Sequence, residues 1–249
     1  LMARDYPERE AHDLMRYADV ALFAAKRAGR DQVRIFDTEM DAGQKMRRAI
    51  EHGLATALEH EQLRLYYQPI VERDGLQTVG FEALLRWSSE EYGNVSPALF
   101  IPIAEESLLI HSIGNWVIDR ALQDCRNWPD QYVSINLSPR QFKHEAVIDR
   151  LIERAAYWNV PHRNIQIEIT ETAIFENIDH AMDMVLRLRK AGFRIALDDF
   201  GTGYSSLFNV KNFALDCIKI DKSFVESLGS DRQSAAIVNS VAQLARSLG

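Results

Sequence analysis

From about residue 61 onward, the sequence alternates between short apolar runs and longer amphipathic stretches, and this alternation limits the fold most strongly. Six runs have the length and composition of strands: LRLYYQPIV, TVGFEALLRW, YVSINLS, IQIEIT, FRIALDD and DCIKID. Helical periodicity separates most of them, over residues 100–127, 147–158 and 178–191. Such alternation is typical of a parallel sheet with crossover helices, so we predict an α/β protein.

Every run except the first ends in polar side chains. These side chains are Glu82, Arg86, Asn136, Glu168, Glu171, Asp198, Asp199, Lys219 and Asp221. In a barrel of parallel strands, the C-terminal strand ends and the loops after them converge on one mouth, where the site is built. A TIM-like barrel would therefore bring these acids together. A doubly wound sheet is the rival architecture, but no glycine-rich phosphate turn follows the first strand, and the acids are spread over many strands.

The adjacent carboxylates Asp198 and Asp199 begin the stretch DDFGTGYSSL. Two like charges repel, and a buried pair resists ionisation unless a cation or hydrogen bonds hold it. A turn that closes a strand is the simpler interpretation, since Asp and Gly are common in turns. Together with Glu82, Asn136 and Glu168, however, the pair forms an all-oxygen donor set. Mg²⁺ and Mn²⁺ prefer such donors, whereas the lack of a clustered His or Cys set argues against zinc.

This donor set favours a site for two divalent ions. A water held between two ions is a nucleophile suited to in-line attack on a phosphodiester. Lys219 could position that water or neutralise developing charge. For each acid alone, a solvated side chain at a strand end is the competing interpretation. Five such residues on successive strands weaken that interpretation.

Composition is consistent with a folded chain and restricts its partners. The length of 249 residues suffices for one barrel or two smaller domains, and the 47% hydrophobic content argues for a packed core. The net charge is -7 and the sequence has no run of basic residues, which argues against binding to a nucleic acid polymer. Cys125 and Cys217 lack paired spacing, so we expect both in the core rather than in a disulfide or zinc site.

No signal peptide or membrane-spanning stretch is evident in the sequence. This portion is therefore expected to be cytoplasmic, and sensor or membrane segments could lie upstream of it.

Residues 1–37 differ in pattern from the rest. A helix is expected with one apolar face made by Leu14, Ala18, Ala21, Leu22 and Ala25. Gly29 would end this helix, and a short strand over 33–36 would follow. Residues 38–60 are predicted to form a connecting helix, because apolar side chains recur at three- and four-residue spacings at Met46, Ile50, Leu54 and Leu58.

Five motifs together resemble the EAL family of cyclic di-GMP phosphodiesterases: FEALLRW, SINLSPRQF, IEITET, DDFGTGYSSL and IKIDKSFV. The resemblance covers about residue 45 to the end. It implies a TIM-like (β/α)8 barrel over 61–249 that hydrolyses cyclic di-GMP to linear pGpG in bacterial second-messenger signalling. Family members continue into two further strands that carry another metal-ligating Glu. The barrel is thus expected to lack its last two strands here, which leaves the activity of this chain open.

The resemblance also implies roles for individual residues. Two Mg²⁺ or Mn²⁺ ions would be held by Glu82, Asn136, Glu168, Asp198 and Asp199. The expected catalytic residues are Lys219, Glu82 and Asp198, and the expected substrate contacts are Gln68 and Arg86. Calcium should bind but inhibit, because its looser coordination sphere would misplace the attacking water. A regulatory loop linked to dimerisation would involve Glu171, Gly201, Thr202, Gly203 and Tyr204, so a homodimer through the EAL domain is expected.

The stretch YADVALFAAKRAGRDQVRIF resembles the closing helix and strand of a GGDEF diguanylate cyclase domain. This implies an upstream GGDEF-like domain, either an active cyclase or a degenerate domain that binds GTP.

An alternative function remains open, namely an inactive cyclic di-GMP receptor on the same barrel. In such receptors the acidic metal ligands have been replaced, whereas the acidic ligands that this sequence contains are intact. Four aromatic residues could stack on guanine, although barrel packing accounts for most of them: Tyr66, Tyr67, Trp87 and Phe200.

Overall fold

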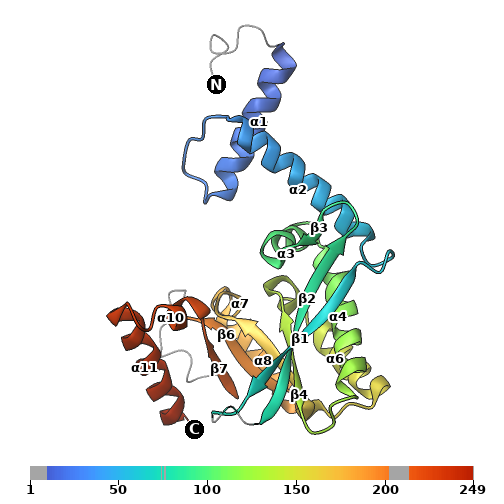
Figure 1. Cartoon of the computed structure of the whole chain (residues 1–249), viewed down its shortest axis with the longest axis vertical. Coiled ribbons are helices and arrows are strands. Elements are labelled where there is room, and N and C mark those ends of the chain that lie inside the picture. Colours follow the sequence, from blue (N-terminus) through green and yellow to red (C-terminus); the bar gives the residue numbers. More distant parts are fainter. Residues whose placement is uncertain (1–9, 74, 76, 202–212, 249) are drawn as a thin grey trace.

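The computed structural model of the chain describes residues 10–73, 75, 77–201 and 213–248. Its centre is a curved sheet with the strand order β1-β2-β4-β5-β6-β7, and a short strand β3 pairs with β2 (Figure 1). The parallel strands are β2 (Thr78–Ser89), β4 (Tyr132–Leu137), β5 (Ile165–Thr170), β6 (Arg194–Phe200) and β7 (Cys217–Ile220). Among the described residues, β1 and β7 are the two edges and do not pair. The predicted α/β fold with a TIM-like parallel sheet is confirmed, and the barrel is not closed.

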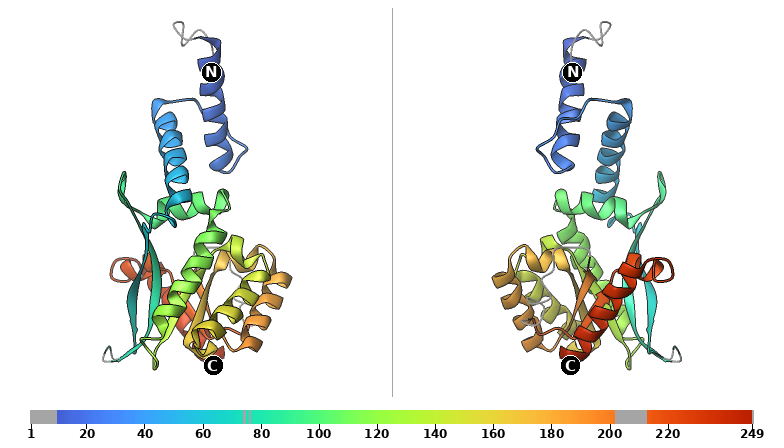
Figure 2. Two further views of the ribbon diagram at one scale, coloured as in Figure 1. Left: turned by 90° about the vertical axis from the view of Figure 1, so that its right-hand side faces the viewer. Right: turned by 90° about the vertical axis from the view of Figure 1, so that its left-hand side faces the viewer.

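Helices cover the outer face of the sheet (Figures 1 and 2). They also carry most of the buried apolar residues of the main core. The long ones are α4 (Leu109–Cys125), α6 (Ala146–Trp158) and α8 (Ile178–Ala191). The others around the sheet are α3 (Pro97–Glu106), α5 (Pro139–Phe142), η2 (His162–Asn164), α7 (Glu171–Phe175), α10 (Lys222–Glu226) and α11 (Arg232–Leu248). Strands β4 and β5 are buried almost throughout, as expected for parallel strands that are covered on both faces.

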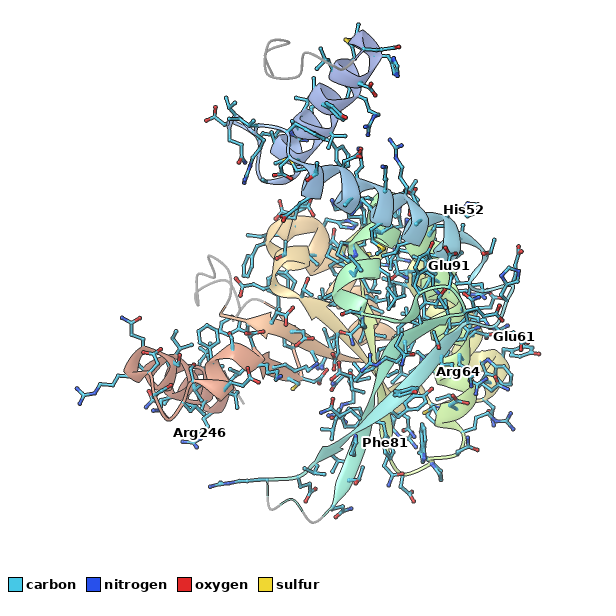
Figure 3. All side chains as sticks on the ribbon, turned by 45° about the horizontal axis from the view of Figure 1, so that its top comes forward. His52, Glu61, Arg64, Phe81, Glu91 and Arg246 are labelled. Carbon is cyan, nitrogen blue, oxygen red and sulfur yellow. The ribbon has the colours of Figure 1, made fainter. Side chains whose placement is uncertain are left out.

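Strand β1 (Leu63–Val71) corrects the expectation of a wholly parallel sheet, because it runs antiparallel to β2. The six residues between the two strands are too few for a crossover helix, which needs about a dozen residues, so the strands pair as a hairpin instead. The resulting β1–β2 ribbon carries side chains on both faces along its length, with Arg64 on β1 and Phe81 on β2 (Figure 3). Gln68 lies directly opposite Glu82 in this pairing.

The helix predicted over 100–127 is divided into α3 and α4. Leu108, between them, has a left-handed backbone with φ 65°, which no helix interior accommodates. Strand β3 (Gly93–Val95) was not predicted, because three residues are too few to show an alternating pattern.

The N-terminal helices α1 (Ala11–Arg27) and α2 (Thr38–Thr56) project from one end of the molecule, away from the sheet (Figure 2). A small cluster joins them, formed by Tyr17, Val20, Ala21 and Phe36 with Leu14 and Met40. We refer to it as the N-terminal cluster. The predicted end of α1 at Gly29 is close to the observed one, and Asp37 caps α2 by accepting from the Met40 N–H at 2.7 Å.

Three predictions for this region are wrong. Residues 33–36 form no strand, and the side chains of Val33 and Ile35 are 92% and 75% exposed. Ala18 and Leu22 of the predicted apolar face are exposed, because Tyr17 and Val20 make the contacts instead. Helix α2 ends at Thr56 rather than at residue 60. No helix in the described part of the chain has the length and apolar content needed to cross a membrane.

Candidate active site

The parallel pairing of four strands brings carboxylates together at one end of the sheet. Asn136 on β4 lies beside Glu168 on β5, and Thr170 at the end of β5 lies beside Asp198 on β6. Glu82 comes from β2, and the amide Nδ2 of Asn136 donates to its Oε1 at 3.0 Å. Oxygens of Glu82, Glu168 and Asp198 all lie within 4.8 Å of one another. The predicted convergence of these side chains is therefore present; below, these three acids are the carboxylate cluster.

Lys219 on β7 contacts all three members of the carboxylate cluster. Its Nζ lies 2.5 Å from Glu168 Oε2, 3.1 Å from Glu82 Oε2 and 3.1 Å from Asp198 Oδ2. Three carboxylates against one ammonium leave an excess of two negative charges when all are ionised. The site as built thus favours a further cation.

Burial gives Glu168 an unusual place in the carboxylate cluster. Its side chain is wholly buried, whereas those of Glu82 and Asp198 remain partly exposed. Burial raises the pKa of Glu168 to about 7, although Lys219 and Ser134 favour its charged form. Burial alone would lower the pKa of Lys219, but the surrounding carboxylates outweigh it and raise that pKa above its ordinary value. Lys219 is therefore a cation at neutral pH.

A bulge holds the second acid of the adjacent pair. The register of β6 against β7 shifts between Leu197 and Phe200, and Asp199 has a left-handed φ of 56°. The Asp199 N–H donates to Asp198 Oδ1 at 2.9 Å. Partial desolvation and the adjacent Asp198 charge raise the pKa of Asp199. Asp199 is not among the three carboxylates that meet within 4.8 Å.

The residues expected to contact substrate lie along the β1–β2 ribbon. Gln68 is opposite Glu82, and Arg86 lies four residues beyond Glu82 on β2, opposite Arg64 of β1. The Arg86 guanidinium lies 5.7 Å from the ring centroid of Tyr66 and donates to the Leu85 carbonyl at 2.8 Å. A cavity of about 280 Å³ adjoins this strand, with Arg86, Asn136, Glu105 and Thr170 in its lining.

The expected regulatory residues are only partly described. Glu171 is buried at the start of α7, and its Oε2 accepts from the Gly201 N–H at 3.0 Å. Gly201 has φ 103°, and a Cβ there would lie 2.9 Å from the ring of Phe224, so a larger residue would not fit without a shift. Thr202, Gly203 and Tyr204 lie outside the described residues.

Two polar residues beneath the carboxylate cluster were not anticipated. Ser134 Oγ donates to Glu168 Oε1 at 2.6 Å, and Gln166 Nε2 donates to Ser134 Oγ at 3.0 Å. Both residues are buried. Each lies two positions before a predicted ligand, Ser134 before Asn136 and Gln166 before Glu168. Polar residues at this period of two on one face of a strand are the signal that could have revealed them.

The aromatic and cysteine predictions can be judged from burial. Trp87 and Phe200 are fully buried, and Tyr67 donates to Asp124 Oδ2 at 2.9 Å, so packing accounts for these three rings. Tyr66 is 60% exposed and is the exception. Cys125 is in the core as predicted, whereas Cys217 on β7 is half-buried.

Comparison with known proteins gives consistent results. The model of the EAL domain family matches residues 51–249. The bifunctional diguanylate cyclase/cyclic di-GMP phosphodiesterase MucR of Pseudomonas aeruginosa is 36% identical over 242 residues, 95% of this chain and 35% of MucR. The cyclic di-GMP phosphodiesterase PdeR of Escherichia coli is 34% identical over 239 residues, 94% of this chain and 36% of PdeR.

A solved structure also matches closely in shape. The PaMucR phosphodiesterase in complex with c-di-GMP superposes with a TM-score of 0.78 at 36% identity, covering 80% of this chain and 83% of that one. The chain itself spans between 30% and 38% of the length of the curated relatives it matches.

Proposed function

The chain belongs to the EAL domain family, and on that basis we propose that it hydrolyses cyclic di-GMP to linear pGpG with Mg²⁺ or Mn²⁺ as cofactor. The observation that carries this proposal is the carboxylate cluster, with Lys219 at its centre. Its relative PdeR is a cyclic di-GMP phosphodiesterase, and the PaMucR structure holds c-di-GMP.

The donor set fits two divalent ions in kind and charge. Glu82, Asn136, Glu168, Asp198 and Asp199 offer oxygen only, the ligand type that Mg²⁺ and Mn²⁺ prefer. The three carboxylates exceed the single ammonium in charge, so added positive charge would be stabilised there. When bound, these ions would supply an acidified water as the nucleophile.

Lys219 and the β1–β2 ribbon have separate tasks in this proposal. The Lys219 ammonium donates its hydrogen bonds to Glu82, Glu168 and Asp198, and from this position it would balance negative charge that develops at phosphorus. The water oxygen bonds to phosphorus as the bond from phosphorus to the 3′-oxygen breaks, and the proton that the water loses ends on the leaving 3′-oxygen. Arg86 would contact phosphate, and Gln68, opposite Glu82, would contact substrate beside the cluster.

Metal removal tests the proposal directly. We expect the natural full-length protein to convert cyclic di-GMP to pGpG with Mg²⁺ or Mn²⁺, to stop in excess EDTA, and to be inhibited by Ca²⁺. Chromatography of the nucleotide products measures this. Full activity in excess EDTA would contradict the metal-dependent mechanism. Tight binding of cyclic di-GMP without any turnover in Mn²⁺ would instead support the receptor function.

We also propose the domain organisation and its regulation. Residues 1–37 would be the end of a GGDEF-like domain, residues 38–60 the connection, and residues 61–249 the phosphodiesterase barrel. Helix α2 supports a mechanical link, because Met40 at its start contacts the N-terminal cluster while Ile50 and Leu54 lie in the main core. A dimer contact near the loop after Asp199 would then bias the site through Gly201 and Glu171.

The rate of hydrolysis against GTP concentration tests this link. A response is expected in the natural full-length protein and not in a version that begins at residue 38. A GTP response that persists without the upstream part would reject the proposed communication.

A further inference from the structure

Glu168 is held from two sides by different kinds of donor. Its Oε2 accepts from Lys219 at 2.5 Å, and its Oε1 accepts from the Ser134 hydroxyl at 2.6 Å. Ser134 is 0% exposed and Glu168 is 1% exposed, so water does not compete for these hydrogen bonds. The orientation of this carboxylate is therefore set by protein groups alone.

With Glu168 ionised, the hydrogen bonds below it have one consistent direction. A serine hydroxyl has a single hydrogen, and the carboxylate of Glu168 takes it. Ser134 Oγ can then act only as the acceptor from Gln166 Nε2, which lies 3.0 Å away. Gln166 thus fixes the direction in which the serine hydroxyl points. Strand register places this chain of donors, since Ser134 pairs with Gln166 and Asn136 pairs with Glu168.

Simple packing does not explain the choice of these side chains. Buried polar groups lower stability unless they are hydrogen-bonded, and apolar residues of similar shape would fill the same space. Gln166 also carries a cost, because its buried Oε1 has no hydrogen-bond partner among the described residues. A glutamine that leaves one atom unpaired indicates that its other atom, the donor to Ser134, has a role.

We propose that Ser134 and Gln166 are positioning residues that orient Glu168 for metal binding. The inference rests on the proposed function. It adds that two buried residues behind the carboxylate cluster set the orientation of one metal ligand. Ser134 occupies Oε1 and leaves Oε2 directed toward Lys219 and the other two carboxylates. Hydrogen-bond partners behind metal ligands commonly change metal affinity about 10- to 100-fold.

Mn²⁺ affinity, measured by calorimetry on the whole chain, tests this separately from turnover. Ser134→Ala should weaken Mn²⁺ binding about tenfold. Gln166→Glu keeps the side-chain shape but replaces the donor with an acceptor, so the serine hydroxyl turns away from Glu168 and binding should weaken similarly. Ser89→Ala is the matched control, because Ser89 is also buried and its Oγ accepts two backbone N–H groups away from the cluster. It should leave Mn²⁺ affinity unchanged.

A double-mutant cycle separates positioning from a general loss of packing. With Glu168→Gln in place, adding Ser134→Ala should change Mn²⁺ affinity less than twofold, because the acceptor it orients has been altered. Thermal unfolding of each variant checks the fold, and if Ser134→Ala does not fold, Gln166→Glu alone decides.

The inference is overturned if both single variants bind Mn²⁺ as tightly as the natural chain while Glu168→Gln binds it more weakly. If Glu168→Gln also leaves Mn²⁺ binding unchanged, the metal site of the proposed function fails, and the inference fails with it.

Discussion

The carboxylate cluster and the N-terminal cluster differ in how many elements hold them. Three strands supply the acids and a fourth supplies Lys219; the first three have a neighbour on both sides, and β7 pairs with β6. The N-terminal cluster has only two helices and the segment between them, with four buried side chains. A residue in the first region is fixed from several directions, whereas one in the second depends on few contacts. Changes at the first should therefore affect the whole molecule or its chemistry, and changes at the second should stay local.

The largest effect is expected where a negative charge of the carboxylate cluster is removed. Asp198→Ala should lower hydrolysis by the natural full-length protein at least about 10³-fold, equivalent to roughly 4 kcal/mol, because it removes both a proposed metal ligand and a partner of Lys219. Asp183→Ala, an exposed acid on α8, is the control and should leave the rate unchanged.

Lys219→Met sharpens that contrast within the site. It removes a cation from among the carboxylates, so Mn²⁺ affinity should be retained or increased while the rate falls. Calorimetry and product analysis on the same samples separate the two effects. Equal loss of Mn²⁺ binding in Asp198→Ala and Lys219→Met would show that the two residues do not have separate roles.

A smaller effect is expected when apolar contacts are removed from the two regions. Leu151→Ala, at a fully buried position of α6, should lower the free energy of unfolding by about 2–5 kcal/mol. Val20→Ala in the N-terminal cluster should cost about 1 kcal/mol and leave hydrolysis unchanged. Denaturant unfolding measures both, and hydrogen exchange should show faster opening of α1 alone in the second variant. A loss of stability by Val20→Ala as large as that by Leu151→Ala would show that the two regions unfold together.

The difference between the two regions, one held by several strands and the other by few contacts, also explains what the sequence could predict. The strands that carry Asn136, Glu168 and Asp198 were predictable, because apolar runs of strand length alternate with amphipathic helices. Parallel pairing then made the meeting of their polar ends predictable as well. The direction of β1 was missed, although the six-residue connection to β2 already excluded a crossover helix.

Other features depend on contacts that no local pattern records. Hydrogen-bond directions, such as that from Gln166 to Ser134, follow from which side chains meet across strands. The bulge at Asp199 depends on the register of β6 against β7. Residues 33–36 have the alternation of a strand, but a strand needs a neighbour with which to pair, and none is present among the described residues. The local sequence of residues 33–36 thus favours an extended strand, but only pairing with another strand could stabilise it.

The smallest effect is therefore expected at the two exposed side chains of that segment. Replacing Val33 and Ile35 together with serine should change the free energy of unfolding of this chain by less than about 0.5 kcal/mol, because neither side chain is buried. Phe36→Ala is the matched control in the same segment, since Phe36 is 7% exposed and stacks on Tyr17 at 4.1 Å, and it should cost more. In the natural full-length protein, the proposed GGDEF-like domain would cover Val33 and Ile35, and the same double substitution should then be clearly destabilising. An equal and negligible effect in both proteins would argue against that domain. A large effect in this chain would contradict the exposure of the Val33 and Ile35 side chains.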